Sequence, residues 1–168
     1  MDREITNYDT EGFCKVYRML RSRCKLLDSS IFKAGVSFCA MESNGVNIID
    51  YIMDIMELKN KLINFKTVFD HCVEKLETKY RQVILLKIYY SKLTVEEMCG
   101  ILDVKERTLF RRIEQAFNML ADLLNKSKNK DKILQIYDDP FVQGVLEDVR
   151  ERRKAFKMRN KEIDEQCK

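Results

Sequence analysis

The sequence contains a single proline, Pro140, and only five glycines in 168 residues. A β-sheet protein needs a tight turn between neighbouring strands, and proline and glycine are the main residues that make such turns. The hydrophobic fraction is 45% and the charged fraction is 35%, which suits amphipathic helices. The sequence therefore predicts an all-α fold, and 168 residues suit one compact domain or one domain with an appended arm.

The first predicted helix covers about residues 11–27. Its apolar residues recur at intervals of three and four, which places them on one face of a helix. They are Phe13, Val16, Tyr17, Leu20, Cys24 and Leu27. Basic residues fall largely outside this face, and they form either a solvated surface or a contact with phosphates. They are Arg18, Arg21, Arg23 and Lys25.

Residues 28–47 are predicted to be a connector with room for one short helix. The apolar spacing weakens here, and Ser29, Ser30, Gly35 and the Ser43-Asn44-Gly45 cluster are typical of turns. Together with the first helix and the helix that follows, this connector makes residues 1–79 an N-terminal helical region.

A heptad pattern predicts a long helix over about residues 48–79. Its apolar seam consists of Ile48, Ile52, Ile55, Leu62, Phe69, Val73 and Leu76. Lys59 and Lys66 occupy two further seam positions, and charged seam residues weaken a free-standing coiled coil. We therefore expect the helix to pack on its own domain, with a homodimer zipper as the alternative. The apolar segment 79–90 that follows is predicted to be a buried helix.

Residues 80–125 are predicted to contain a helix-turn-helix. Thr94 and Glu97 have the spacing of a capping box, in which each side chain accepts a hydrogen bond from the other residue's backbone N–H, so a helix should begin here. Met98, Ile101 and Leu102 are expected on its inner face. Cys99 and Gly100 are small residues that would let two crossing helices approach closely.

A second helix should follow a short turn at Asp103, with Val104 filling the core between the two helices. Its inward residues are predicted to be Leu109, Ile113, Ala116, Phe117, Leu120 and Leu124. The residues left facing outward are Lys105, Arg107, Thr108, Arg111, Arg112 and Gln115. The major groove of B-DNA accepts a helix, and arginines on its first turns can contact guanine or phosphates. The pattern therefore favours a DNA-binding helix over a plain helical corner.

At these residues, segment 80–124 resembles region four of bacterial sigma factors, the module that reads the −35 promoter element. The matching positions are Thr94, Glu97, Met98-Cys99, Leu102-Asp103-Val104, Leu109 and Arg112. Cys99 stands where alanine is usual, and Asp103 stands where glycine is commoner. The resemblance implies DNA contacts by Lys105, Glu106, Arg107, Thr108, Arg111 and Arg112.

A complete sigma factor would also need a promoter-opening region with exposed aromatic residues, and residues 1–79 show no such cluster. The layout of an N-terminal helix, a connector, a long heptad helix and a region-four-like motif is similar instead to phage sigma-like regulators of the ArpU and RinA type. That resemblance implies a transcription activator, with double-stranded DNA and bacterial RNA polymerase as partners.

Residues 126–168 are predicted to form a basic hinge and a charged tail helix. The hinge lysines are Lys126, Lys128, Lys130 and Lys132. Asp139 followed by Pro140 is typical of a helix start, and the helix should run toward Ile163. Its many arginines and lysines alternate with acidic residues, which favours a solvated helix over an additional nucleic-acid or protein contact.

Catalytic and metal sites are not expected. The six cysteines form no C-x-x-C pair, so we expect no metal and no cofactor, and the cysteines should be small core residues. His71 is the only histidine and should be an ordinary partly buried residue. It cannot serve Cys72 as a base, because neighbouring side chains on a helix diverge by about 100°. With no Gly-rich phosphate loop, the sequence predicts no enzyme.

Residues 1–10 do not resemble a signal peptide, and no apolar run approaches the roughly 20 residues that a membrane span requires. We therefore expect a cytoplasmic protein with no membrane partner, either a monomer or a homodimer. Two functions stay open. One is a sequence-specific transcription regulator that inserts the helix beginning at Lys105 into the major groove. The other is a helical adaptor or phage packaging subunit that uses the motif and the long helix for protein contacts.

Overall fold

The computed structural model describes residues 3–40, 45–90 and 92–166, and every regular element within these ranges is a helix. In chain order the helices are α1 (Asn7–Ala40), α2 (Gly45–Glu74), α3 (Thr78–Tyr89), α4 (Val95–Leu102), α5 (Glu106–Asn125), α6 (Lys130–Leu134) and α7 (Pro140–Gln166). The predicted all-α fold is confirmed.

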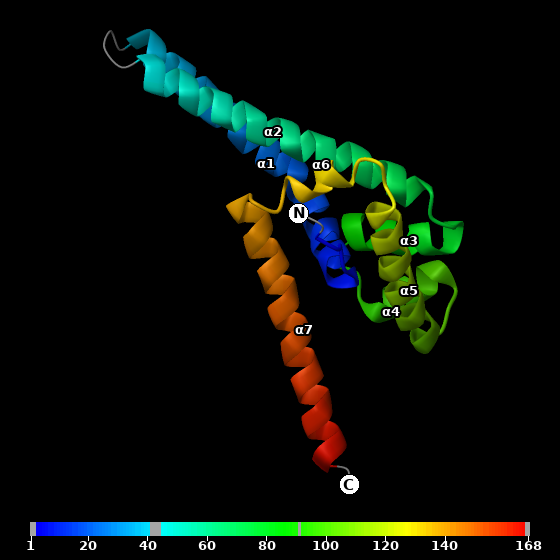
Figure 1. Ribbon diagram of the computed structural model, residues 1–168. Helices are drawn as coiled ribbons and strands as arrows, with labels where there is room; N and C mark the ends of the chain where they lie inside the picture. The colour runs from blue at the N-terminus through cyan, green and yellow to red at the C-terminus, as the bar shows by residue number, and fades with distance from the viewer. Residues whose placement is uncertain (1–2, 41–44, 91, 167–168) are drawn as a thin grey trace.

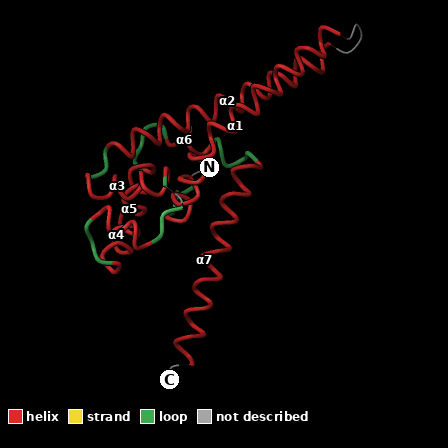
Figure 2. Tube along the Cα trace, turned by 180° about the vertical axis from the view of Figure 1, so that it is seen from behind, coloured by secondary structure: helices red, strands yellow, loops and turns green. Residues whose placement is uncertain are grey.

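Helices α1 and α2 lie side by side and run in opposite directions, as a hairpin whose far end projects from the body (Figure 1). The other helices gather at the near end, where α3, α4 and α5 form one group, α6 lies on α2, and α7 lies on α1 (Figures 1 and 2). One buried cluster joins residues of α1, α2, α3, α5, α6 and α7. The body is therefore held together by a shared core.

Helix α1 begins at Asn7 rather than near residue 11, because Thr6 and Asp9 cap its first turn. The backbone N–H of Thr6 donates to the Asp9 carboxylate at 3.0 Å, and the N–H of Asp9 donates to the Thr6 hydroxyl at 3.3 Å. The predicted apolar face is confirmed. Phe13, Val16, Leu20 and Leu27 are buried, and Tyr17 and Cys24 are half-buried.

The predicted connector at residues 28–47 is wrong, because α1 continues to Ala40. The hydroxyls of Ser29 and Ser30 donate to the carbonyls of Lys25 and Leu26 at 3.0 and 3.1 Å. A serine that bonds the carbonyl one turn earlier can stay inside a helix, so it need not mark a turn. Gly35 also lies within α1, and Gly45 begins α2. Ser43 and Asn44 fall outside the described residues.

The seam of α2 packs against its own chain. Ile55, Leu62, Phe69 and Val73 are buried, and Ile48 and Ile52 are half-buried. The two seam lysines are compensated locally: Lys59 pairs with Asp28 of α1, and Lys66 pairs with Asp70 at 2.6 Å. The helix ends at Glu74 rather than near residue 79, and Leu76 is buried in the turn that leads to α3.

Residues 126–139 are not a plain hinge, because they contain α6. Ile133, Ile136 and Tyr137 are buried in the main core at helical spacing, which the four lysines mask in the sequence. The exposed lysines of this segment are Lys126, Lys128 and Lys132. The predicted start of the tail helix is confirmed, since the carboxylate of Asp139 accepts the backbone N–H of Phe141 at 2.8 Å, next to Pro140.

Candidate nucleic-acid interface

Helix α4 begins with the capping box that the sequence predicted. The Thr94 hydroxyl accepts the backbone N–H of Glu97 at 3.2 Å, and the Glu97 carboxylate accepts the backbone N–H of Thr94 at 2.7 Å. Two N–H groups that have no partner within the helix are thereby satisfied. This cap fixes the residue at which α4 starts.

The turn between the two helices is centred on Asp103, whose φ of 47° and ψ of 55° are left-handed. Asp103 is the one non-glycine residue with positive φ among the described residues. Glycine adopts this conformation without a steric penalty, whereas an L-residue with a Cβ pays one. The backbone N–H of Val104 donates to the carbonyl of Cys99 at 3.1 Å, which closes the turn.

A small apolar core joins α3, α4 and α5. Leu86, Met98 and Leu109 are buried in it, and Leu102 and Val104 pack against it, so Val104 fills the space between the helices as predicted. Ile101 does not belong to the inner face, because its side chain is 58% exposed. A Cβ at Gly100 would meet nothing within 4 Å, so Gly100 does not mark a close helix crossing. The eight residues of α4 present only a narrow buried stripe.

Helix α5 has the two faces that its periodicity predicted. The inward set is buried except for Ile113, which is half-buried. Of the predicted DNA-contact residues, Lys105, Glu106, Arg107, Arg111 and Gln115 are exposed, and Thr108 and Arg112 are half-buried. The last two lie at the edge of the outward face. Lys105 precedes the first helical residue, and its side chain makes no capping hydrogen bond.

The basic residues of this face are not neutralised within the protein. Within residues 3–40, 45–90 and 92–166, no ion pair involves Lys105, Arg107, Arg111 or Arg112, although α2 and the first half of α7 carry such pairs. Four cations therefore lie within eight residues with only Glu106 among them, and three of the four are exposed while Arg112 is half-buried. Such a surface attracts a polyanion, because released counterions favour association.

Gln115 differs from the rest of the predicted set, because it contacts α3. The Tyr80 hydroxyl donates to its side-chain oxygen at 3.2 Å. The amide is exposed, but its oxygen is engaged and its position is fixed. Gln115 thus marks the boundary between the outward face and the packing of α5 on α3.

Phe110 is a residue of this face that sequence reasoning missed. Its side chain is 51% exposed on α5, one residue before Arg111. The sequence could have predicted its exposure, because Phe110 follows the buried Leu109 by one residue and therefore points about 100° away from the core face. An exposed aromatic ring between arginines can make apolar contact with the methyl group of thymine.

The outward face of α5 is open. Helix α7 packs against α1 and leaves the first turns of α5 uncovered, as Figures 1 and 2 show from opposite sides. The exposed fractions of Lys105, Arg107 and Arg111 agree with this arrangement. The side of the helix-turn-helix that would meet DNA is therefore accessible in the folded chain.

Part of the chain, including this helix-turn-helix, matches a known protein family. Residues 66–120 match Sigma-70, region 4. The match begins in α2 and contains α3, α4, the turn at Asp103 and the outward residues of α5. It covers about a third of the chain, 55 of 168 residues. Comparisons with curated proteins and with solved structures found no match.

The match confirms the region-4-like helix-turn-helix expected from the sequence, and it supports a DNA-binding, transcription-related role for this segment. The capping box, the left-handed turn and the basic second helix all lie inside the matched span. The helices of the hairpin before residue 66 and the helices α6 and α7 lie outside it.

The histidine and the five cysteines that the structure describes show no arrangement for chemistry, and Cys167 lies outside the described residues. Cys14 and Cys72 are buried, and burial raises the pKa of both thiols, so they stay protonated. Cys24 and Cys99 are half-buried and Cys39 is exposed, so the expectation that the cysteines belong to the core holds only in part. His71 is exposed rather than partly buried.

Among residues 3–40, 45–90 and 92–166, no group of three or more histidine, cysteine, aspartate or glutamate residues is placed to hold a metal ion. None of the helices in the same ranges is both long enough and apolar enough to cross a membrane.

Proposed function

We propose that this protein is a sequence-specific DNA-binding transcription regulator that inserts the first two turns of α5 into the major groove. The observation that carries the proposal is the outward face of α5, which lies in a segment that matches Sigma-70, region 4. Its four cations, Lys105, Arg107, Arg111 and Arg112, have no carboxylate partner among the residues that the structure describes. Folding leaves their charge available for a ligand.

The position of each residue on the outward face of α5 indicates its role in DNA binding. Lys105 and Arg107 belong to the start of α5, where a helix in the major groove reaches base edges. Arg111 and Arg112, one turn later, are placed for phosphate contacts or for guanine, and Phe110 for a thymine methyl. Glu106 can accept a hydrogen bond from the amino group of cytosine. Thr94 and Glu97 cap α4, and Gln115 holds α5 against α3, so these three residues do not need to touch DNA.

The first experiment is selection of bound duplexes from a random DNA pool, followed by anisotropy measurements on the enriched sequence. Replacing Arg107, Arg111 and Arg112 with alanine should lower affinity by at least about 100-fold, because a good base or phosphate contact contributes about 1 to 3 kcal/mol. Affinity of the unaltered protein should fall steeply between about 50 and 200 mM salt.

A matched control removes three exposed cations elsewhere on the body. Replacing Lys126, Lys128 and Lys132 with alanine changes net charge equally but leaves α5 intact. This variant should keep the sequence preference of the unaltered protein. Absence of any enriched sequence, or equal losses in the two triple variants, would contradict the proposal.

The proposal extends to the origin of the protein, its location in the cell and its partners. We propose a phage or prophage sigma-like regulator in the cytoplasm, with bacterial RNA polymerase as a second partner and no enzymatic activity of its own. The support is the region-4 match at residues 66–120 together with a helical N-terminal region that precedes it. In vitro transcription from a promoter that carries the selected sequence, with purified polymerase, tests this point. Unchanged transcript levels at saturating protein would contradict it.

A second candidate function is that of a helical adaptor or phage assembly subunit. It is favoured by exposed apolar side chains on the projecting part of the hairpin, where Phe32 is 73%, Val36 55% and Met53 62% exposed. Light scattering discriminates between the two functions. A stable ring-like oligomer that does not bind DNA supports the adaptor, whereas a monomer or dimer that shifts DNA supports the regulator.

A further inference from the structure

A hollow of about 490 Å³ lies where α1, α2 and α3 meet. Helix α3 packs there against both helices of the hairpin, at the end near the body (Figure 1). The floor of the hollow is apolar, because Leu20 of α1, Leu62 of α2 and Ile88 of α3 are buried in it. Small-molecule sites have volumes of about 300 to 1,000 Å³ and mostly apolar linings. The hollow therefore has the size and the lining of such a site.

The walls of the hollow leave apolar surface uncovered. Tyr17 is half-buried, and its ring centre lies 5.3 Å from that of Phe69, which holds this wall in place. Tyr89 and Ile63 also line the hollow, and both side chains are exposed. A ligand with an apolar body would remove this surface from water, which favours binding.

Two arginines at the hollow have no carboxylate partner. Arg18 and Arg21 line it from α1, and both are exposed. Neither takes part in an ion pair in the part of the chain that the structure describes. Lys66 also lines the hollow, but its ammonium group pairs with Asp70 at 2.6 Å. The two guanidinium charges are therefore uncompensated, whereas the charge of Lys66 is met locally.

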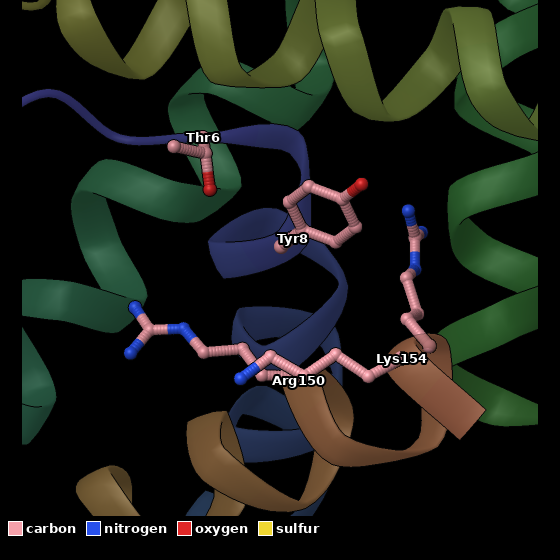
Figure 3. A pocket seen from close by; sticks show the side chains of 5 residues that line it. Thr6, Tyr8, Arg150 and Lys154 are labelled. Atoms are coloured by element: carbon pink, nitrogen blue, oxygen red, sulfur yellow. The ribbon is translucent and has the colours of Figure 1, made fainter. Parts of the chain in front are cut away.

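Figure 3 shows another hollow with basic residues, of about 390 Å³, between the start of α1 and α7. Its arginines already have partners. Arg150 donates to the Asp9 carboxylate at 2.8 Å, and Arg153 donates to Glu11 at 2.6 Å. An anionic ligand there would compete with these two carboxylates, so we assign no ligand to it.

We infer that the hollow between α1, α2 and α3 binds a small molecule with an apolar body and one carboxylate head, of the fatty-acid or aromatic-acid class. Arg18 and Arg21 bind the head, because a guanidinium group can donate two parallel hydrogen bonds to a carboxylate. The floor and the walls bury the body. The lining residues belong to α1, α2 and α3, so this site does not depend on DNA binding by α5.

A ligand in this hollow would join the hairpin to the segment that matches Sigma-70, region 4. Arg18 and Leu20 belong to α1, whereas Ile88 and Tyr89 lie within the matched residues 66–120. A ligand that binds the folded chain and not the unfolded chain raises the melting temperature. Binding should therefore stabilise the body as well as fill the hollow.

The test measures binding of octanoate to the full chain by isothermal titration calorimetry near neutral pH. Octanol has the same chain length without the charge, and octylamine carries the opposite charge. R18Q/R21Q removes the two guanidinium charges. K25Q/K33Q is the charge-matched control, because both lysines are exposed on α1 and neither lines the hollow. Far-UV circular dichroism verifies that both variants fold as the unaltered protein does.

Octanoate should bind the unaltered protein at least about tenfold more tightly than octanol, because hydrogen bonds between charged groups are the stronger ones. Octylamine should bind more weakly than octanol, since its ammonium group would meet two arginines. R18Q/R21Q should lose about tenfold in affinity for octanoate and keep its affinity for octanol. K25Q/K33Q should stay within about twofold of the unaltered protein for both. Octanoate should raise the melting temperature of the unaltered protein and of K25Q/K33Q.

A second pair of variants tests the apolar wall. Ile63→Gln should weaken binding of octanoate and of octanol alike, because it removes apolar surface that both ligands bury. Met56→Gln is the control, since Met56 is exposed on the same helix and does not line the hollow. In ¹H–¹⁵N spectra of the unaltered protein, octanoate should shift the backbone signals of Leu20, Ile88 and Tyr89.

Absence of octanoate binding, equal affinities for octanoate and octanol, or equal losses in the two charge variants would overturn the inference. Signal shifts centred on Phe32 and Met53, far along the hairpin, would also overturn it. Binding to phosphatidylglycerol vesicles without binding of octanoate would assign the surface to a membrane instead. Loss of DNA affinity in R18Q/R21Q without octanoate binding would assign the two arginines to phosphates. R107A/R111A should bind octanoate as the unaltered protein does, so the two proposals fail separately.

Discussion

The side-chain amide of Asn125, the last residue of α5, forms two hydrogen bonds with the backbone of Ile5. Its oxygen accepts the Ile5 N–H at 3.0 Å, and its nitrogen donates to the Ile5 carbonyl at 2.8 Å. Nearby, the Thr10 hydroxyl donates to the carbonyl of Phe117 at 3.2 Å. Ile5 is thereby tied to the helix that carries the candidate interface, across 120 residues of sequence.

Replacing Asn125 with alanine should lower the free energy of unfolding by about 1 to 3 kcal/mol, because both backbone groups of Ile5 would lose their partner in a partly buried place. Urea denaturation followed by circular dichroism measures the loss. Asn118→Ala is the matched control, since Asn118 is exposed on the same helix and its replacement should change stability by less than about 0.5 kcal/mol. Equal effects of the two substitutions would contradict the role of Asn125.

Replacing Thr94 with alanine should destabilise α4 by about 0.5 to 2 kcal/mol, because the N–H of Glu97 loses its acceptor. Amide hydrogen exchange at Met98 and Cys99 should quicken, while exchange in α2 should not change. Thr94→Ser keeps the hydroxyl and should exchange like the unaltered protein. A serine variant as labile as the alanine variant would show that the cap does not hold α4.

Glycine and alanine substitutions of Asp103 should differ in their effect on stability. Asp103→Gly relieves the left-handed strain at φ 47°. Glycine also gives the unfolded chain more conformational entropy, which offsets part of this gain. The net increase in the free energy of unfolding should be about 0.5 to 1 kcal/mol. Asp103→Ala keeps a Cβ at this position and should not stabilise it. Thermal melting at pH 7 measures both. A higher melting temperature for the alanine variant would refute this account of the turn.

Stability should fall at alkaline pH, and Tyr137 should contribute. Burial, and then the negative charge of Asp9, raises the pKa of Tyr137 above its ordinary value of 10.0. Above pH 10 the unfolded chain releases this phenolic proton while the folded protein retains it. The unfolding free energy therefore decreases with rising pH, by up to about 1.4 kcal/mol per pH unit for one such group.

Tyr137→Phe removes this phenol and should make the decline between pH 10 and 11 shallower by about the same amount. Between pH 7 and 9 the two proteins should show parallel pH dependence, because Tyr137 is then protonated in both the folded and the unfolded chain. Urea denaturation at each pH gives the comparison. Parallel declines above pH 10 would contradict the assignment.

Features that depend on neighbouring residues were predicted well from the sequence. The Thr94–Glu97 box, the turn at Asp103 and the two faces of α5 depend on spacings within one or two helical turns, so the residues alone determine them. The same reasoning failed at Ser29, because turn-forming tendency was counted without the hydroxyl's alternative bond to Lys25.

Contacts between residues far apart in the sequence could not be predicted from local sequence patterns. The bonds between Asn125 and Ile5, and the contact of Tyr80 with Gln115, join residues far apart in sequence. The pairing of Lys59 with Asp28 explains a charged seam position that the heptad pattern could only mark as unusual. At the candidate interface, spacing alone could not show that Thr108 and Arg112 are half-buried, because they lie at the edge of the outward face.

The core that α5 shares with the hairpin makes the two ends of the molecule thermodynamically dependent on each other. Phe117, Leu120 and Leu124 of α5 lie in the same buried cluster as Phe13 of α1 and Phe65 of α2. Separating the hairpin from α5 would expose these apolar residues of α5, so we expect the base of the hairpin and α5 to unfold together. A ligand that binds the folded body at the base of the hairpin should therefore also stabilise α5, and a ligand of α5 should stabilise the base of the hairpin.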